Sequence, residues 1–289
     1  RKDSLEQPDF YAGEETGMIR SDYHMHTEFS TDSEAPVGSM IEAAIQKGLT
    51  EICLTDHYDQ DYPEVPDVEG VPFIFDVDAY FRILEKYRES YKGRIRICTG
   101  IELGLQPHLG AFYKDLTSKY PFDFVIGSVH LIHGIDPYYG EAFRGRTDEE
   151  VYAETFRLTL ENLNMVSDFD VLGHIDYVVR YGKEKAEHYS YRKYADEIDA
   201  ILKKVLDMGK GIELNTGGYK YGLGFCNPHP DIIRRYRELG GEIITVGADA
   251  HCPEHIAYDF AKAKAVLEEC GFRYYTVFEE RKPVFRKID

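Results

Sequence analysis

Histidine and carboxylate side chains recur along this chain just after the places where β-strands are predicted to end. From about residue 19, short apolar runs of strand type alternate with longer runs of helical period. A βα barrel gathers the carboxyl ends of its strands at one mouth, so residues that follow successive strands meet there. The pattern therefore predicts a multinuclear metal centre, with hydrolysis as its chemistry. The nine candidate ligands are His24, His26, Asp32, His57, Glu102, His130, His174, Asp249 and His251.

The alternation of apolar runs predicts an α/β barrel of about seven βα units. A continuous alternation implies parallel strands joined by right-handed crossovers. A doubly wound sheet is the alternative, but it would place the ligands along a crevice rather than around a mouth. Strands are expected at residues 19–25, 51–55, 94–101, 122–129, 170–172, 211–215, 242–246 and 273–278. Helices are expected at residues 38–47, 78–91, 109–120, 148–166, 191–208, 230–239 and 254–270.

The length of 289 residues fits either one large barrel or two ordinary domains. No shift in composition marks a linker, so a single barrel domain over residues 19–289 is the better prediction. Residues 1–18 are polar without a clear period and are expected to form an N-terminal extension.

The charge balance narrows the classes of partner. The chain has 52 acidic and 34 basic residues, a formal net charge of −18, which disfavours binding to nucleic acid. The five cysteines are widely spaced without a CxxC pair, which indicates reduced thiols and a cytoplasmic location. No apolar run reaches the roughly 18 residues of a membrane span. The expected partner is a small phosphorylated substrate, and no pattern specifies an oligomeric state.

The first four candidates lie in two short segments. His24 and His26 are two residues apart in an extended stretch, so both imidazoles point to the same side and can reach one ion. Asp32 follows in a Ser-Thr-Asp-Ser turn, where Asp also serves as a turn former. His57 ends the second predicted strand, and the neighbouring carboxylates of Asp56 and Asp59 can orient its ring.

The remaining candidates follow later strands. Glu102 comes directly after the third predicted strand, where a buried carboxylate is costly unless it meets a cation. Unlike imidazole, its carboxylate can also bridge two ions. His130 and His174 follow the next two strands, and Asp249 and His251 follow the seventh.

These motifs, in this order, resemble those of the PHP (polymerase and histidinol phosphatase) superfamily over about residues 19–285. The matching segments are His24-Met-His26-Thr, Thr55-Asp-His57, Gly100-Ile-Glu102, Ser128-Val-His130, Gly173-His174 and Asp249-Ala-His251. The resemblance implies a distorted (β/α)7 TIM-like barrel with a trinuclear metal site at the carboxyl ends of the strands. Residues 173–181 and the closing strand at 274–283 are most similar to the histidinol-phosphate phosphatase branch.

The resemblance also implies how the ligands divide among two to three divalent ions of zinc, iron or manganese. One site would use His24, His26, Glu102 and Asp249. A second would share Glu102 with His130 and His174, and a third would use Asp32, His57 and His251. Some relatives have His in place of Asp32, and a carboxylate there favours iron or manganese because it is a harder ligand.

The activity implied is hydrolysis of histidinol phosphate to histidinol and phosphate, a step of histidine biosynthesis. A water that bridges two cations would lose its proton near neutral pH and attack phosphorus. Arg180 is the best candidate to bind the phosphate oxygens, because guanidinium forms paired hydrogen bonds with phosphate. Ser128 is a second candidate for phosphate binding. Asp59 is the first choice for the acid that protonates the leaving group, with His108 and His133 as alternatives.

Substrate choice is less constrained than the metal centre. Acidic residues in the loop at 58–69, together with Asp176 and Asn215, would suit the cationic amino alcohol of histidinol. The alternative function is a PHP-type phosphoesterase for a nucleotide or another small phosphate ester. A scaffold domain without activity is a third hypothesis, and it is disfavoured because all nine ligand positions are filled.

Overall fold

The computed structural model describes residues 18–63 and 72–288 of the chain. The predicted extension over residues 1–18 therefore lies almost wholly outside the described residues. In the described part the buried hydrophobic side chains form one continuous core. No helix there is long and apolar enough to cross a membrane. The division into an extension and a single barrel domain stays a prediction.

Seven parallel strands form a nearly closed barrel, which confirms the predicted fold class. They neighbour one another in chain order, except that β3 lies off this path. The barrel closes between its first and last strands, where Tyr23 N donates to Val246 O at 3.0 Å and Met25 forms a parallel bridge with Ala250. The strands are β1 (Ser21–Asp22), β2 (Glu51–Leu54), β4 (Arg96–Gly104), β5 (Phe124–Ser128), β6 (Val171–Leu172), β7 (Gly211–Asn215) and β8 (Ile244–Gly247).

The longest strand, β4, organises one side of the barrel. Its first half pairs with β2, and its second half pairs with β5 and with the short β3 (His57–Tyr58). Both faces of these strands are buried, as expected for parallel strands covered by helices. The register sets His57 opposite Glu102, so two predicted ligands lie side by side on adjacent strands.

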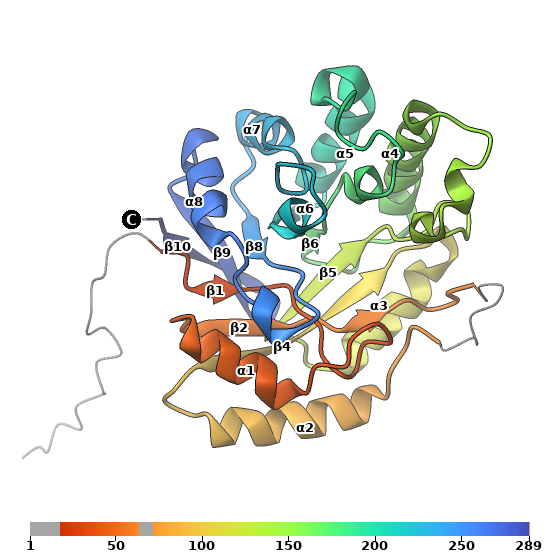
Figure 1. Ribbon diagram of the computed structural model, residues 1–289. Helices are drawn as coiled ribbons and strands as arrows, with labels where there is room; N and C mark the ends of the chain where they lie inside the picture. The colour runs from red at the N-terminus through yellow and green to blue at the C-terminus, as the bar shows by residue number, and fades with distance from the viewer. Residues whose placement is uncertain (1–17, 64–71, 289) are drawn as a thin grey trace, which may run out of the picture.

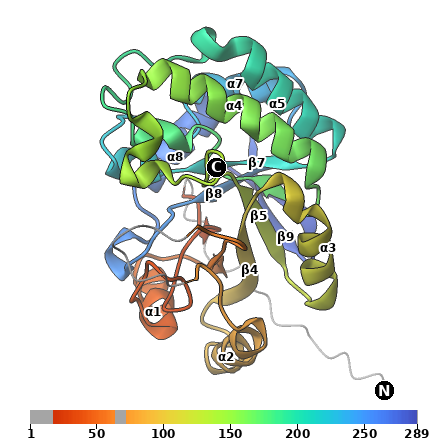
Figure 2. The same cartoon turned by 90° about the vertical axis from the view of Figure 1, so that its right-hand side faces the viewer.

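Helices surround the barrel, with α1 and α2 on one side and α4, α5 and α7 on the opposite side (Figures 1 and 2). The longest, α4, begins with a capping box in which Thr147 and Glu150 exchange side-chain to backbone hydrogen bonds. The α-helices are α1 (Val37–Gln46), α2 (Val77–Ser90), α3 (Gly110–Lys119), α4 (Asp148–Met165), α5 (Ala195–Asp207), α6 (Gly217–Lys220), α7 (Pro230–Glu238) and α8 (Phe260–Glu269). The 3-10 helices are η1 (Pro107–Leu109), η2 (Pro137–Tyr139), η3 (Glu141–Phe143), η4 (Tyr177–Arg180), η5 (Tyr191–Tyr194) and η6 (Pro253–His255).

The last predicted strand lies outside the barrel, which corrects the expectation of a closing strand at 274–283. β9 (Tyr274–Glu279) pairs with β10 (Lys282–Lys287) as an antiparallel hairpin. The hairpin packs against the amino ends of the barrel strands. There the Thr276 hydroxyl accepts from Ile244 N, and the Phe278 ring lies 4.9 Å from that of Phe124. It therefore covers the end of the barrel opposite the predicted ligands.

The predicted helix at 254–270 also begins later than expected. Residues Pro253–His255 form η6, and α8 begins only at Phe260. Ala257 and Asp259 between them adopt left-handed backbone, with φ of 51° and 53°. A residue in this conformation cannot continue a right-handed helix, so the helix has to restart after it.

Candidate metal centre

Glu102 lies at the middle of the predicted ligands. The expected strand ended at Ile101, but β4 continues to Gly104, so Glu102 lies inside the strand and its side chain is fully buried. Burial raises the pKa of this carboxyl group. The charges of His24, His57 and His130 outweigh burial and lower the pKa well below its usual range. Glu102 is therefore an ionised carboxylate enclosed by imidazoles.

The Oε2 atom of Glu102 faces three imidazoles. It lies 3.2 Å from His24 Nε2, 3.5 Å from His26 Nε2 and 3.0 Å from His57 Nδ1. The Nε2 atoms of His24 and His26 are 3.1 Å apart, so the His-x-His pair converges as the extended spacing predicted.

The Oε1 atom of Glu102 faces a separate pair of imidazoles. It lies 3.2 Å from His130 Nε2 and 3.0 Å from His174 Nε2. The Ser128 hydroxyl donates to the same oxygen at 2.7 Å. The two oxygens of one carboxylate thus meet different groups of nitrogens, which is the arrangement that a carboxylate bridging two ions needs.

Asp249 completes the group around the His-x-His pair. Its Oδ1 lies 3.6 Å from His24 Nε2 and 3.3 Å from His26 Nε2. Its backbone N donates to His24 O at 2.8 Å across the closure of the barrel. Asp249 adopts φ of 55°, a left-handed conformation that is uncommon outside glycine. The barrel closure therefore holds this carboxylate in a strained conformation that points it at the two histidines.

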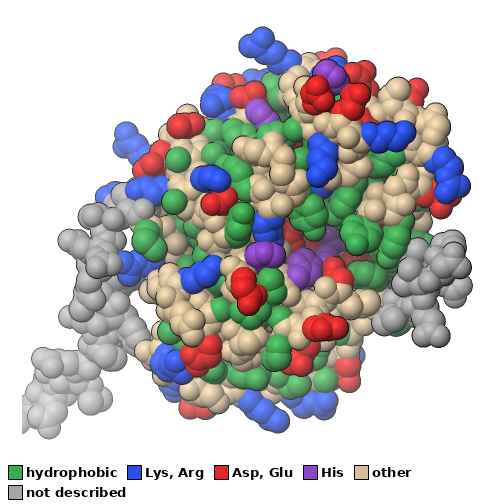
Figure 3. Space-filling view, in the orientation of Figure 1, with side chains coloured by type: hydrophobic (Ala, Val, Ile, Leu, Met, Phe, Trp, Pro, Cys, Tyr) green, Lys and Arg blue, Asp and Glu red, His purple; other side chains and the backbone are tan. Residues whose placement is uncertain are grey.

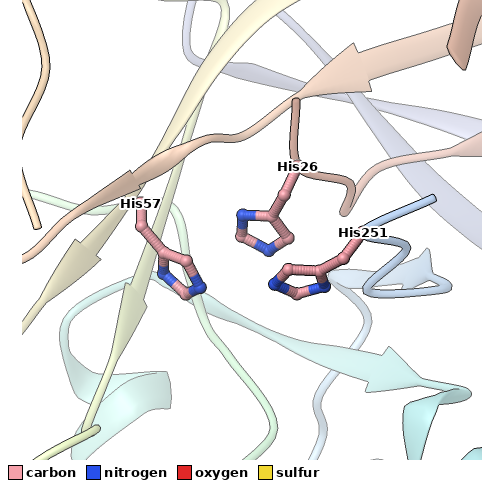
Figure 4. A group of neighbouring side chains, drawn as sticks. All are labelled: His26, His57 and His251. Atoms are coloured by element: carbon pink, nitrogen blue, oxygen red, sulfur yellow. The ribbon is translucent and has the colours of Figure 1, made fainter. Parts of the chain in front are cut away.

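A third group lies nearer the opening. Asp32 Oδ2 is 3.5 Å from His57 Nε2 and 3.2 Å from His251 Nε2. The ring of His26 stacks on those of His57 and His251, each with a centroid separation of 4.1 Å. Figure 4 shows these three rings gathered from separate segments of the chain. The structure thus brings all nine predicted ligands together.

The donor atoms fit divalent cations. Among the described residues, four buried side-chain atoms of this region have no hydrogen-bond partner, and such an atom is costly to bury unless an ion meets it. Imidazole nitrogens and carboxylate oxygens are the ligands that zinc, iron and manganese accept. The four atoms are His57 Nδ1, Asp59 Oδ2, Glu102 Oε2 and His174 Nδ1.

Carboxylates behind the ligands fix the orientation of their rings. Glu213 Oε1 lies 2.6 Å from His24 Nδ1, and Asp59 Oδ1 lies 2.7 Å from His130 Nδ1. In each case the other ring nitrogen, Nε2, faces Glu102. A carboxylate on the far nitrogen selects the tautomer that leaves Nε2 free to bind a metal, and it makes the ring more basic.

Asp59 is therefore held by the ligands themselves. Burial raises its pKa, but the charges and hydrogen bonds of His130 and His57 outweigh burial and lower it. An ionised Asp59 favours orientation of His130 over proton donation at neutral pH. Its role as the acid stays a prediction. The alternatives His108 and His133 do not line the cavity, because they lie exposed on the surface against Asp61 and Glu154.

Arg180 is buried beside the ligands and is anchored within the fold. Its Nη1 donates to Asp249 Oδ2 at 2.9 Å, its Nη2 to Asn215 Oδ1 at 2.9 Å, and its Nε to Asn227 Oδ1 at 2.8 Å. The rings of Tyr177 and Tyr221 lie over the guanidinium. Three of its five N–H groups are engaged in this way, which leaves two for a ligand.

A cavity of about 590 Å³ opens above the ligands. Figure 3 shows histidine side chains gathered in a hollow of this face, beside basic side chains. Arg180 and Asp59 line the cavity, whereas Ser128 is fully buried behind it with its hydroxyl on Glu102. Phosphate binding by Ser128 stays a prediction, and the contact with Glu102 supports an orienting role instead.

Of the described side chains expected to receive a cationic substrate, Asp59 lines the cavity, where it is held by His130 and His57, and the others lie elsewhere. Asp176 and Asn215 are fully buried and do not line the cavity; Asp176 accepts hydrogen bonds from Asn227 and Tyr189. Within the acidic loop, Asp61 is exposed. The remaining acidic residues of that loop, Glu64, Asp67 and Glu69, fall outside the described residues.

Three further residues were missed by reasoning from the sequence. Glu213 supports His24. Lys220 lines the cavity and donates from Nζ to Asp249 O at 2.8 Å. Asp136 lines the same cavity from the loop before η2. Glu213 had a signal, since it is a carboxylate in the apolar run Gly-Ile-Glu-Leu and points to the same side as Asn215. Asp136 had none because it lies in a loop, and Lys220 had none because it ends the four-residue helix α6, which is too short to show a helical period.

Comparisons with known proteins agree with this geometry. A family model described as PHP domain matches residues 22–217. A probable histidinol-phosphatase of Clostridium acetobutylicum is 35% identical over 90% of this chain and 97% of its own length. The histidinol-phosphatase of Lactococcus lactis is 30% identical over 92% of this chain and 96% of its own length. A crystal structure of the Lactococcus lactis enzyme complexed with zinc, L-histidinol and phosphate superposes with a TM-score of 0.83, covering 92% of this chain and 98% of that one.

Proposed function

Because the chain belongs to the PHP domain family, we propose that it is a metal-dependent phosphatase that hydrolyses histidinol phosphate. The observation that carries this proposal is the position of Glu102, whose two carboxylate oxygens face separate groups of imidazoles at the floor of a cavity. The substrate is inferred from relatives that match the chain over nine-tenths of its length and carry that name.

Three ions would be shared among the nine ligands. The first would be held by His24, His26, Glu102 and Asp249, and the second by Glu102, His130 and His174. The third would be held by Asp32, His57 and His251. Divalent ions in these positions supply Lewis acidity, which neutralises phosphate charge and activates water for attack on phosphorus. Zinc is bound in the Lactococcus lactis structure, and iron and manganese suit the same donors.

The residues of the chain orient the ester. Arg180 and Lys220 approach the cavity from the side of Asp249, so they would pair with the phosphate oxygens that face away from the ligands. Burial lowers the pKa of Lys220, and the carboxylate of Asp249 opposes that effect. Asp59 would hold His130 in place, and Ser128 would do the same for Glu102.

A panel of three esters tests the proposal. Histidinol phosphate, AMP and p-nitrophenyl phosphate would be compared by kcat/KM with protein whose metal content has been measured. We expect two to three ions per chain and a preference of at least about 100-fold for histidinol phosphate, the range in which a few specific polar contacts discriminate between substrates. Equal kcat/KM for the three esters would exclude histidinol phosphate as the specific substrate. A preference for AMP would identify a nucleotide phosphatase instead.

A further inference from the structure

Tyrosine side chains form a wall around the mouth of the cavity. The wall starts at the ligands, because the Tyr177 ring lies 4.8 Å from that of His174, and it continues to Tyr181 at 5.1 Å. Tyr138 contacts Tyr181 at 5.9 Å from a separate loop. The tyrosine wall comprises Tyr62, Tyr138, Tyr139, Tyr177, Tyr181 and Tyr221.

One carboxylate, Asp136, is set into this wall. Its Oδ2 accepts from the Tyr62 hydroxyl at 2.5 Å, and its Oδ1 accepts from the backbone N of Tyr138 at 2.8 Å. Asp136 lies after β5, just before η2, and is only partly exposed. A carboxylate has about four acceptor positions, so roughly half of its capacity is left for a ligand.

Asp136 has no basic side chain paired with it in the described part of the chain. Four acidic residues line the cavity, and Asp32, Asp59 and Asp249 each lie against imidazoles. Within residues 18–63 and 72–288, the polar contacts of Asp136 are with the Tyr62 hydroxyl and the Tyr138 backbone, and it makes no ion pair with Lys, Arg or His. Burial raises the pKa of Asp136, and the hydrogen bonds from Tyr62 and Tyr138 and the charge of His130 only partly oppose that effect.

The cavity is therefore divided by charge. Arg180 and Lys220 both bind Asp249 and form its basic side, next to the ligands. Asp136 and Tyr62 form an acidic side among aromatic rings. An ester with an anionic group at one end and a cationic or aromatic group at the other matches this division, because both charges would meet opposite charges.

We propose that Asp136, held by Tyr62, is the counter-ion for the protonated nitrogen of the leaving alcohol, and that the tyrosine wall packs against its ring. The inference rests on the proposed function and assigns the half of the substrate that is not phosphate. A carboxylate provides a charge-assisted hydrogen bond to the nitrogen. The faces of neighbouring tyrosines add attraction for a cation or a flat ring. Asp136 is then a specificity-determining residue rather than a part of the phosphate chemistry.

The substitution Asp136→Asn tests this role, because it removes the charge and keeps the shape. The readout is the ratio of kcat/KM for histidinol phosphate to kcat/KM for p-nitrophenyl phosphate, which lacks a basic nitrogen. We expect the ratio to fall roughly 10- to 100-fold, the range for losing a hydrogen bond between charged groups. The inhibition constant of L-histidinol should rise by a similar factor, whereas that of inorganic phosphate should change much less.

Two variants serve as controls. Asp61→Asn removes a neighbouring carboxylate that pairs with His108 on the surface, and it should leave the ratio unchanged. Asp136→Glu keeps the charge and should recover part of the preference. If Asp136→Asn does not fold, Tyr62→Phe takes its place, and a fall of several-fold is expected because the hydroxyl that orients Asp136 is lost.

The outcomes separate the inference from the proposed function. A wild-type protein without preference for histidinol phosphate overturns the function, whatever Asp136 does. A wild-type protein with that preference, together with Asp136→Asn that retains both the preference and the affinity for L-histidinol, overturns the inference alone.

Discussion

Replacing Glu213 by glutamine should weaken metal binding without disturbing any direct ligand. Glu213 is buried, its Oε1 lies 2.6 Å from His24 Nδ1, and its Oε2 accepts from His174 N at 3.0 Å. Glutamine has one oxygen in place of two. Its amide N–H groups must therefore face one of these two N–H donors, and the ring of His24 loses its fixed tautomer or the loop at His174 shifts.

The size of the effect follows from the contact that is lost. A hydrogen bond to a charged group contributes about 1.5–3 kcal/mol. Removing a carboxylate behind a metal-binding histidine costs roughly 10- to 100-fold in metal affinity, which is about 1.4–2.7 kcal/mol and agrees with that range. We therefore expect the dissociation constant of the most tightly bound zinc ion to rise by roughly 10- to 100-fold.

The measurement is a zinc titration of metal-free protein in competition with a chelating dye, accompanied by thermal unfolding of the same preparation. Asp170→Asn is the matched control, because Asp170 is also buried but pairs with Arg281 at the opposite end of the barrel. That variant should lower the melting temperature and leave zinc affinity unchanged. The reasoning is refuted if Glu213→Gln binds zinc as tightly as wild type, or if Asp170→Asn weakens zinc binding to the same extent.

Other perturbations have equally definite outcomes. Asp32→His should raise the affinity for zinc relative to manganese, since imidazole is a softer ligand than carboxylate; elemental analysis after competitive loading would show an unchanged ratio if Asp32 is not a ligand. Arg180→Lys should lower kcat/KM for phosphate esters by roughly 100-fold, because lysine cannot donate to Asp249 and to a phosphate at the same time as the planar guanidinium can. Activity close to wild type would contradict a role of Arg180 in phosphate binding. Thiol labelling at pH 8 should modify Cys252 in the native protein before Cys98 and Cys270, because Cys252 is partly exposed whereas the other two are buried, which raises their pKa to about 12 and about 11. Burial raises the pKa of Cys252 as well, so the expected difference is one of access and rate. Rapid labelling of Cys98 in folded protein would show that the barrel opens at its amino end.

The fold was predictable where hydrophobic period alone decides the structure. The seven barrel strands and their helices were foreseen because parallel strands are apolar on both faces and the intervening helices are amphipathic. The final hairpin was not predictable. Its turn has positive φ at Glu280 and Arg281, whereas a hairpin turn is usually recognised in a sequence by asparagine or glycine at such positions. Period also cannot tell an antiparallel strand from a parallel one.

The residues of the site also fall into those that the sequence could predict and those that it could not. The convergence of the nine candidate ligands was predictable because eight of them lie in or just after a strand, so position along the chain sets position in space, whereas Asp32 lies in the loop between β1 and α1. The positions of Asp136 and Lys220 were not predictable, because neither a loop nor the four-residue helix α6 shows a hydrophobic period, and their place at the cavity depends on packing between distant segments. Ser128 was predicted correctly in one respect and not in the other. It lies at the end of a strand as expected, but its hydroxyl donates to Glu102 instead of facing the cavity.

The closure of the barrel by β1 and β8 has a consequence for how the chain folds. The carboxylate of Asp22 accepts from Ala248 N and Ala257 N, 226 and 235 residues away. Such distant contacts form late, because the entropy of the whole intervening chain opposes them. An ion held jointly by His24 and Asp249 would act as a cross-link across that span, and by analogy with a covalent link it would remove about 5 kcal/mol of chain entropy from the unfolded state. The two ends of the sequence would then be held together by the same ions that the active site needs, so a chain that had not finished folding would also be a chain without activity.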